Sequence, residues 1–245
     1  MSDYPGLMAG TGLLPQHLAN SIAQVASVFG GPASGVTEHG TGFLVRRKDG
    51  KSYLVTAAHV LFKPPFGYPR RVTLLFGQWS DSYAMAVTVE AGPGEPFVVA
   101  DEFRQMPVPS AGSDFGLVRI TDPQGDLANY HHFIASSADP VQSIVRLYGY
   151  PKNDNDPQSD DPFYTVLEAV PEGSQSFSYA HIADQQGPTA PATYRGMSGG
   201  PLIGNSSTDQ TDRVFGIHTR GGTDVRAVRM SSKVRNTLKG WIGTA

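Results

Sequence analysis

The sequence is most constrained at residues 193–201, which read Thr-Tyr-Arg-Gly-Met-Ser-Gly-Gly-Pro. Three glycines and a proline around one serine break both helix and strand, so we expect a tight turn here. Such a turn projects the hydroxyl of Ser198, while the N–H groups of Gly196 and Ser198 point to one place, as in an oxyanion hole. An ordinary β-turn is the alternative, because glycine and serine are common in loops.

Two other residues supply the partners that a nucleophilic serine needs. His59 ends the apolar run Tyr-Leu-Val-Thr-Ala-Ala-His at residues 53–59, which places an imidazole at a strand terminus. Asp114 begins a β-rich run, Asp-Phe-Gly-Leu-Val-Arg-Ile, where its carboxylate can fix the tautomer of an imidazole. The chain order His, Asp, Ser is one of the known orders of a catalytic triad. Each motif alone is also compatible with a core histidine or a turn aspartate.

With these three motifs, the sequence from about residue 21 onward resembles the chymotrypsin-fold (trypsin-like) serine proteases. The resemblance implies an all-β fold of two six-stranded antiparallel β-barrels followed by a C-terminal helix. It implies that His59, Asp114 and Ser198 are catalytic and that the amides of Gly196 and Ser198 form the oxyanion hole. It also implies a polypeptide substrate bound as an extended strand, with no metal and no organic cofactor.

Composition agrees with this class and excludes others. The 245 residues include 28 glycines and 19 prolines, which suits an all-β chain with many turns. A net charge of -3 gives no broad basic surface for nucleic acid, and no run approaches the ~20 apolar residues of a membrane span. Cysteine is absent and residues 1–14 make a poor signal peptide, so an intracellular bacterial or viral protein is favoured over a secreted one. We expect a monomer.

Hydrophobic alternation and turn residues divide the chain. We expect an irregular arm at 1–20, a first barrel at 21–122, a connection at 123–142, a second barrel at 143–231 and a C-terminal helix within 232–245. Ser232 is the expected N-cap of that helix. The predicted strands are 21–29, 40–45, 52–56, 72–76, 83–90, 97–101 and 114–120, then 143–151, 163–170, 175–181, 201–204, 213–218 and 224–230.

The sequence also bears on the residue before the cleaved bond, called P1. Residues 192–194 carry no acid where trypsin-type pockets place a carboxylate, so cleavage after Lys or Arg is disfavoured. The run Gly-Ile-His-x-x-Gly at 216–221, with Thr193 before the serine, resembles the bacterial glutamyl endopeptidases of the family. That resemblance implies that Thr193 and His218 bind a P1 Glu carboxylate, His218 adding positive charge if protonated. The backbone of Gly216, Ile217 and His218 is expected to pair with the substrate. A small polar or Gln preference stays open.

Several alternatives remain at this stage. A viral polyprotein protease, or a bacterial protease acting on one dedicated partner, would keep the same fold and chemistry. A catalytically silent, peptide-binding scaffold is the alternative from a different functional class. The acidic segment 152–161 is interpreted as a solvated loop, with a calcium site as the alternative. His131 and His132 are interpreted as solvent-facing residues, because neighbouring side chains on a strand diverge.

Overall fold

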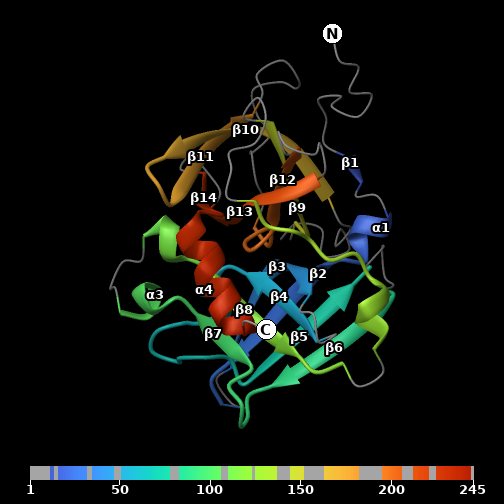
Figure 1. Ribbon diagram of the computed structural model, residues 1–245. Coiled ribbons are helices and arrows are strands. Elements are labelled where there is room, and N and C mark those ends of the chain that lie inside the picture. Colours follow the sequence, from blue (N-terminus) through green and yellow to red (C-terminus); the bar gives the residue numbers. More distant parts are fainter. Residues whose placement is uncertain are drawn as a thin grey trace.

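The computed structural model consists of two rolled antiparallel β-sheets stacked on one another, with the helix α4 (Ser232–Ile242) lying beside both (Figure 1). The expected all-β fold with two barrel-like sheets and a C-terminal helix is confirmed. The structure describes residues 12–13, 16–31, 35–46, 51–77, 83–105, 110–122, 125–136, 144–151, 163–181, 195–205, 212–220 and 225–243.

The first sheet is an open half-barrel rather than the expected closed barrel of six strands. Its order is β6-β5-β2-β3-β4-β8-β7, and β6 does not pair with β7 in the described register. The short β7 and the half-exposed β6, which buries none of its residues completely, explain why this seam stays open. The strands are β2 (Ile22–Phe29), β3 (Val36–Arg46), β4 (Ser52–Thr56), β5 (Arg71–Phe76), β6 (Met85–Glu90), β7 (Phe97–Val99) and β8 (Gly116–Ile120).

The second sheet does close into a six-stranded barrel. Its strands follow the order β9-β10-β11-β14-β13-β12, the pairing of β12 with β9 completes the ring, and β1 adds to the edge of β10. The barrel is filled by apolar side chains, Met197 of the serine-containing turn among them. The strands are β1 (Gly12–Leu13), β9 (Ile144–Gly149), β10 (Phe163–Glu172), β11 (Ser176–His181), β12 (Pro201–Asn205), β13 (Asp212–Arg220) and β14 (Arg226–Arg229).

Short helical segments occupy some of the connections. Residues 16–19 form α1 (Gln16–Ala19) within the arm that was expected to be irregular, and Leu18 and Ala19 join the core. The predicted strand 97–101 ends early, because α3 (Asp101–Gln105) begins with two acidic residues that suit a helix N-terminus. The remaining segments are α2 (Ala58–Leu61), η1 (Ala111–Ser113) and η2 (Asp126–Asn129).

The register between β4 and β8 determines what can meet at the edge of the first sheet. All five residues of β4 are buried, since this strand lies between β3 and β8 in the middle of the sheet. Thr56, at the end of β4, is paired with Gly116, at the start of β8. His59 comes shortly after Thr56, and Asp114 comes shortly before Gly116. Both therefore lie at the edge of the sheet that is formed by the ends of these two strands.

The helix α4 joins the second barrel to the neighbourhood of Asp114. Its apolar face buries Val234 and Leu238, and the ring of Trp241 packs against Phe115 with centroids 5.4 Å apart. The N-cap differs from the expectation of Ser232. The hydroxyl of Ser231, one residue earlier, accepts a hydrogen bond from the N–H of Val234 at 3.4 Å.

We expect Ser231→Ala to lower the free energy of unfolding by about 1 kcal/mol, because it leaves an amide of the first turn without its acceptor. Ser232→Ala is the matched control and should change that free energy by less than about 0.5 kcal/mol, as for most surface substitutions. Urea denaturation followed by circular dichroism measures both. A larger loss for Ser232→Ala than for Ser231→Ala would return the cap to the residue expected from the sequence.

Candidate active site

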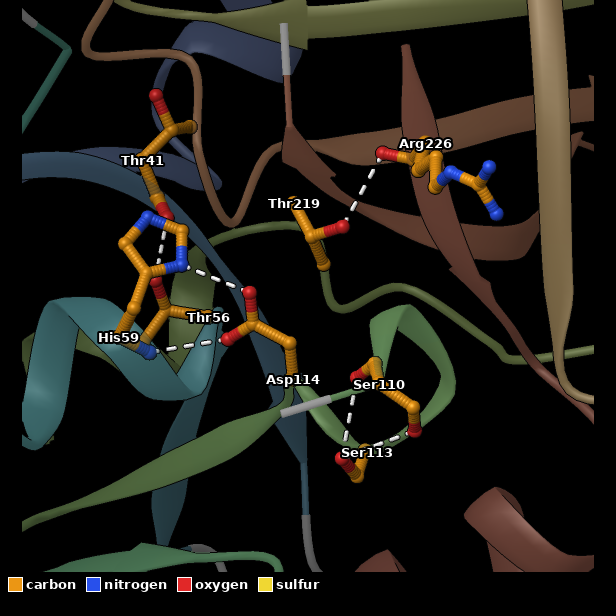
Figure 2. A network of polar contacts seen from close by, with 8 residues as sticks. All are labelled: Thr41, Thr56, His59, Ser110, Ser113, Asp114, Thr219 and Arg226. Atoms are coloured by element: carbon orange, nitrogen blue, oxygen red, sulfur yellow. Dashed lines mark hydrogen bonds and ion pairs between the residues drawn. The ribbon is translucent and has the colours of Figure 1, made fainter. Parts of the chain in front are cut away.

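His59 and Asp114 form a two-point hydrogen-bonded pair. His59 lies on the one-turn helix α2, directly after β4, and the buried Val60 and Leu61 anchor this helix in the core. The Nδ1 atom of His59 is 2.8 Å from Oδ2 of Asp114, and the backbone N–H of His59 donates to Oδ1 at 2.9 Å. Figure 2 shows both contacts. The carboxylate therefore fixes the imidazole ring and the backbone of the same residue.

The segment that carries Asp114 is itself held on both sides. Before it, the hydroxyl of Ser113 donates to the carbonyl of Ser110 at 3.0 Å, which closes the turn at η1 (Figure 2). After it, Phe115 is buried and its carbonyl accepts from the N–H of Ala100 at 3.1 Å. Asp114 is only 9% exposed, so its carboxylate faces the imidazole from a largely dry position.

The surroundings favour the charged form of His59. Burial lowers the pKa of this imidazole, but the charge of Asp114 and the hydrogen bond to it outweigh burial, so the pKa is raised above 6.5. Glu38 raises this pKa further and Lys63 lowers it. Glu38 and Lys63 form an ion pair with each other beside the histidine. Because the folded-state pKa is raised, His59 stabilises the fold at low pH, and this contribution is lost as pH rises through that pKa.

Ser198 lies in a turn that fits tightly against the same edge of the first sheet. Gly196 and Gly199 have φ angles of 89° and 90°, which side-chain-bearing residues rarely adopt. A Cβ on Gly199 would lie 2.1 Å from the carbonyl of Thr41. A Cβ on Gly40 would lie 2.8 Å from the carbonyl of Ser198 and 2.7 Å from Val60, the neighbour of His59. The turn thus packs at once against the middle of β3 and close to Ala57, the residue before α2.

The backbone of Gly216, Ile217 and His218 is already occupied, which corrects the expectation that it pairs with a substrate. Gly216 and Ile217 lie between β12 and β14, with partners on both sides. The N–H of His218 donates to the carbonyl of Gly200 at 2.9 Å, and its carbonyl accepts from the N–H of Gly199 at 2.7 Å. The register with β12 ends at Ile217, so an added strand would have to pair beyond His218.

The side chain of His218 is buried and neutral. Its exposed fraction is 1%, and burial, together with the nearby His59, lowers its pKa to about 3. The imidazole therefore carries no charge at neutral pH, so the protonation on which the expected positive charge depends is not met in this state. Thr193, the partner expected for His218, lies outside the described residues.

Other predicted features lie away from this site or outside the described residues. His131 is exposed, with its ring 5.0 Å from that of Phe133, and His132 is half-buried beside the hydroxyl of Ser52 at 3.4 Å. The acidic segment 152–161 lies outside the described residues. Within the described ranges, no group of three His, Cys, Asp or Glu residues is arranged to hold a metal ion. No helix in this part of the chain is long and apolar enough to cross a membrane.

The sequence reasoning missed three residues around the histidine and the serine turn. Glu38 and Lys63 flank His59, and Thr41 is hydrogen-bonded to the carbonyl of Ser198 through its N–H at 2.7 Å. The signal for Thr41 was present, because glycines at 40 and 42 interrupt a strand and indicate close approach of another backbone. Glu38 and Lys63 carry no comparable signal, since their pairing depends on tertiary contact.

The chain is similar in sequence and in fold to known peptidases. A family model described as a trypsin-like peptidase domain matches residues 40–217. No curated protein matches the sequence. A Glu endopeptidase in complex with MPD has a TM-score of 0.70 at 13% identity, over 96% of this chain and 98% of that chain. The protease Anisep from Arthrobacter nicotinovorans has a TM-score of 0.68 at 13% identity, over 96% and 100%. A thermostable serine protease, AL20, from an extremophilic microorganism has a TM-score of 0.67 at 14% identity, over 94% of this chain and 100% of that chain.

Removing either member of the Glu38–Lys63 pair should move the pKa of His59, in opposite directions. Lys63→Ala leaves Glu38 uncompensated and should raise the pKa, whereas Glu38→Gln leaves Lys63 uncompensated and should lower it. Titration of the His59 ring signals by NMR measures both shifts. Lys233→Ala is the control, because it breaks an exposed ion pair with Glu102 on another element. Shifts of the same sign in both variants would contradict the assigned charges.

Proposed function

Because the chain belongs to the trypsin-like peptidase family, we propose that it is a serine endopeptidase acting through His59, Asp114 and Ser198. The observation that carries the proposal is the two-point contact of Asp114 with His59, at the sheet edge against which the Ser198 turn is packed. The raised pKa of His59 supports the assignment, because a base that takes a proton must be stable in its protonated form.

The proposed mechanism uses only side chains and backbone amides of this chain. His59 takes the proton of the Ser198 hydroxyl as its oxygen attacks the peptide carbonyl, and Asp114 stabilises the imidazolium that forms. The N–H groups of Gly196 and Ser198 bind the developing oxyanion. His59 then gives the proton to the leaving amine. Water, activated by the same imidazole, hydrolyses the acyl-enzyme and restores Ser198.

We further propose that the enzyme prefers Glu at P1 and that His218 and Thr193 bind its carboxylate. The support is the sequence pattern around His218 and the similarity of the fold to a Glu endopeptidase. A neutral imidazole has a single N–H, and the ring of His218 is hydrogen-bonded to the backbone of Arg226, so a P1 carboxylate would be bound by the second ring nitrogen once it takes up a proton. An incoming carboxylate would also raise the pKa of His218 toward the charged form. The substrate strand is assigned to the β13 edge beyond His218.

The direct test maps cleavage sites in a peptide library by mass spectrometry, for the protein and its Ser198→Ala variant. We expect cuts after Glu that disappear in the variant, since removing a triad serine lowers kcat by about 10⁶-fold in a measured case. Labelling of Ser198 by a fluorophosphonate is the control, because it detects a competent active site even when the enzyme accepts too few substrates to cleave the library. A folded protein that neither cleaves nor is labelled would be a silent scaffold and would refute the proposal.

The role of His218 is tested separately with matched substrates that carry Glu or Gln at P1. We expect His218→Gln to lower kcat/KM for the Glu substrate by about 10–100-fold, the equivalent of one hydrogen bond to a charged group. For the Gln substrate, which presents no charge, the same variant should lower kcat/KM by a smaller factor. An equal loss for both substrates would mean that His218 supports the fold of the pocket and does not recognise the carboxylate.

A further inference from the structure

Every polar group of Thr41 is hydrogen-bonded, and its N–H and hydroxyl bind the second barrel. It is fully buried on β3, and its carbonyl accepts from the hydroxyl of Thr56 at 2.6 Å (Figure 2). Its N–H donates to the carbonyl of Ser198 at 2.7 Å. Its own hydroxyl donates to the carbonyl of Gly196 at 2.9 Å and accepts from the N–H of Tyr150 at 3.0 Å.

The contact with Tyr150 fixes which way the Thr41 hydroxyl points. A backbone N–H only donates, so the hydroxyl oxygen must accept there. The hydroxyl proton is therefore available for the carbonyl of Gly196, which lies in hydrogen-bonding range. Tyr150 directly follows β9, so the second barrel orients a hydroxyl of the first barrel toward the serine turn.

These contacts control the peptide planes of the turn. The carbonyls of Gly196 and Ser198 are both bound by Thr41, and the carbonyl of Met197 between them accepts from the N–H of Gly200 at 2.9 Å. Three consecutive peptide planes are thus fixed. Thr41 holds the first and the third, and the N–H of Gly200 holds the middle one, which carries the N–H of Ser198. The buried side chain of Met197 anchors the same segment in the second barrel.

Gly196 is the weak point of this arrangement. Glycine adopts either sign of φ with little penalty, so its present angle of 89° has to be held by its surroundings. Without the Thr41 hydroxyl, the buried carbonyl of Gly196 would lack that partner, and rotation of its peptide plane would be the easiest relief. This plane lies between the two planes that carry the N–H groups of Gly196 and Ser198. Its rotation changes the ψ angle of Gly196 and the φ angle of Met197, which set the orientation of those two amides relative to one another.

We propose that Thr41 is a positioning residue whose hydroxyl holds the amides of Gly196 and Ser198 in the orientation that binds the oxyanion. The inference rests on the proposed function and adds a residue that touches neither the substrate nor the reacting atoms. A purely structural tie between the barrels would affect stability alone. A positioning role affects transition-state binding while it leaves ground-state binding unchanged.

The test compares Thr41→Val, which keeps the shape but removes the hydroxyl, with Thr41→Ser, which keeps the hydroxyl. We expect Thr41→Val to lower kcat by about 10–100-fold with little change in KM, less than the 10²–10³-fold loss when an oxyanion donor is removed. Thr41→Ser should restore most of kcat. A peptide aldehyde, whose adduct with Ser198 carries an oxyanion, should bind Thr41→Val more weakly by a similar factor.

Thr165→Val is the matched control, because Thr165 is a buried threonine of β10 outside the site. It should lower Tm without lowering kcat. If Thr41→Val does not fold, Thr41→Ala replaces it, since the smaller side chain removes the hydroxyl without adding a methyl group. The role of Thr41 would be overturned if the variant without its hydroxyl had a kcat within twofold of the Thr165→Val value. An unchanged affinity of that variant for the aldehyde would overturn it as well. A wild-type protein that neither cleaves nor is labelled would refute the proposed function as well.

Discussion

The site depends on a backbone-to-backbone contact between the two barrels. At Gly199 a Cβ would lie 2.1 Å from both the carbonyl of Thr41 and the hydroxyl of Thr56, which belong to the first barrel. Only glycine allows this approach, because any side chain would force the serine turn away from β3. Gly199 is therefore a requirement of the barrel–barrel junction as much as of the turn, whereas Gly200 is required by packing within the second barrel, where a Cβ would lie 2.2 Å from the carbonyl of Tyr148 on β9.

Sheet register supplies the second requirement. His59 and Asp114 are distant in sequence, yet the pairing of β4 with β8 brings the segments that carry them to one edge. A shift of this register by one residue would turn every side chain of β4 to the opposite face and separate the pair. The complete burial of β4 opposes such a shift, so the apolar core of the first sheet and the geometry of the site are one constraint.

Much of this was predictable from the sequence, because strand alternation and the turn glycines are local signals. The strands around His59 and Asp114 and the C-terminal helix were expected within a few residues of their bounds. The open seam between β6 and β7 was not, since closure depends on how far the sheet curls. The occupied backbone of Gly216 and Ile217 was missed because strand partners are not visible in a single strand. The observed N-cap, Ser231, lies one residue before the predicted Ser232, and the two residues are both serines that could cap the helix equally well by residue type.

The packing of Trp241 against Phe115 has a consequence for the timing of assembly. A nascent chain that has left the ribosome as far as β8 already contains His59 and Asp114. It lacks the serine turn, the β9 strand that precedes Tyr150, and the helix that covers the residue beside Asp114. The two halves of the site are thus made at different times, and the contact that supports the first half comes from a helix that follows the whole second barrel. Under the proposed function, a chain synthesised only as far as β8 carries the base and its carboxylate without the nucleophile.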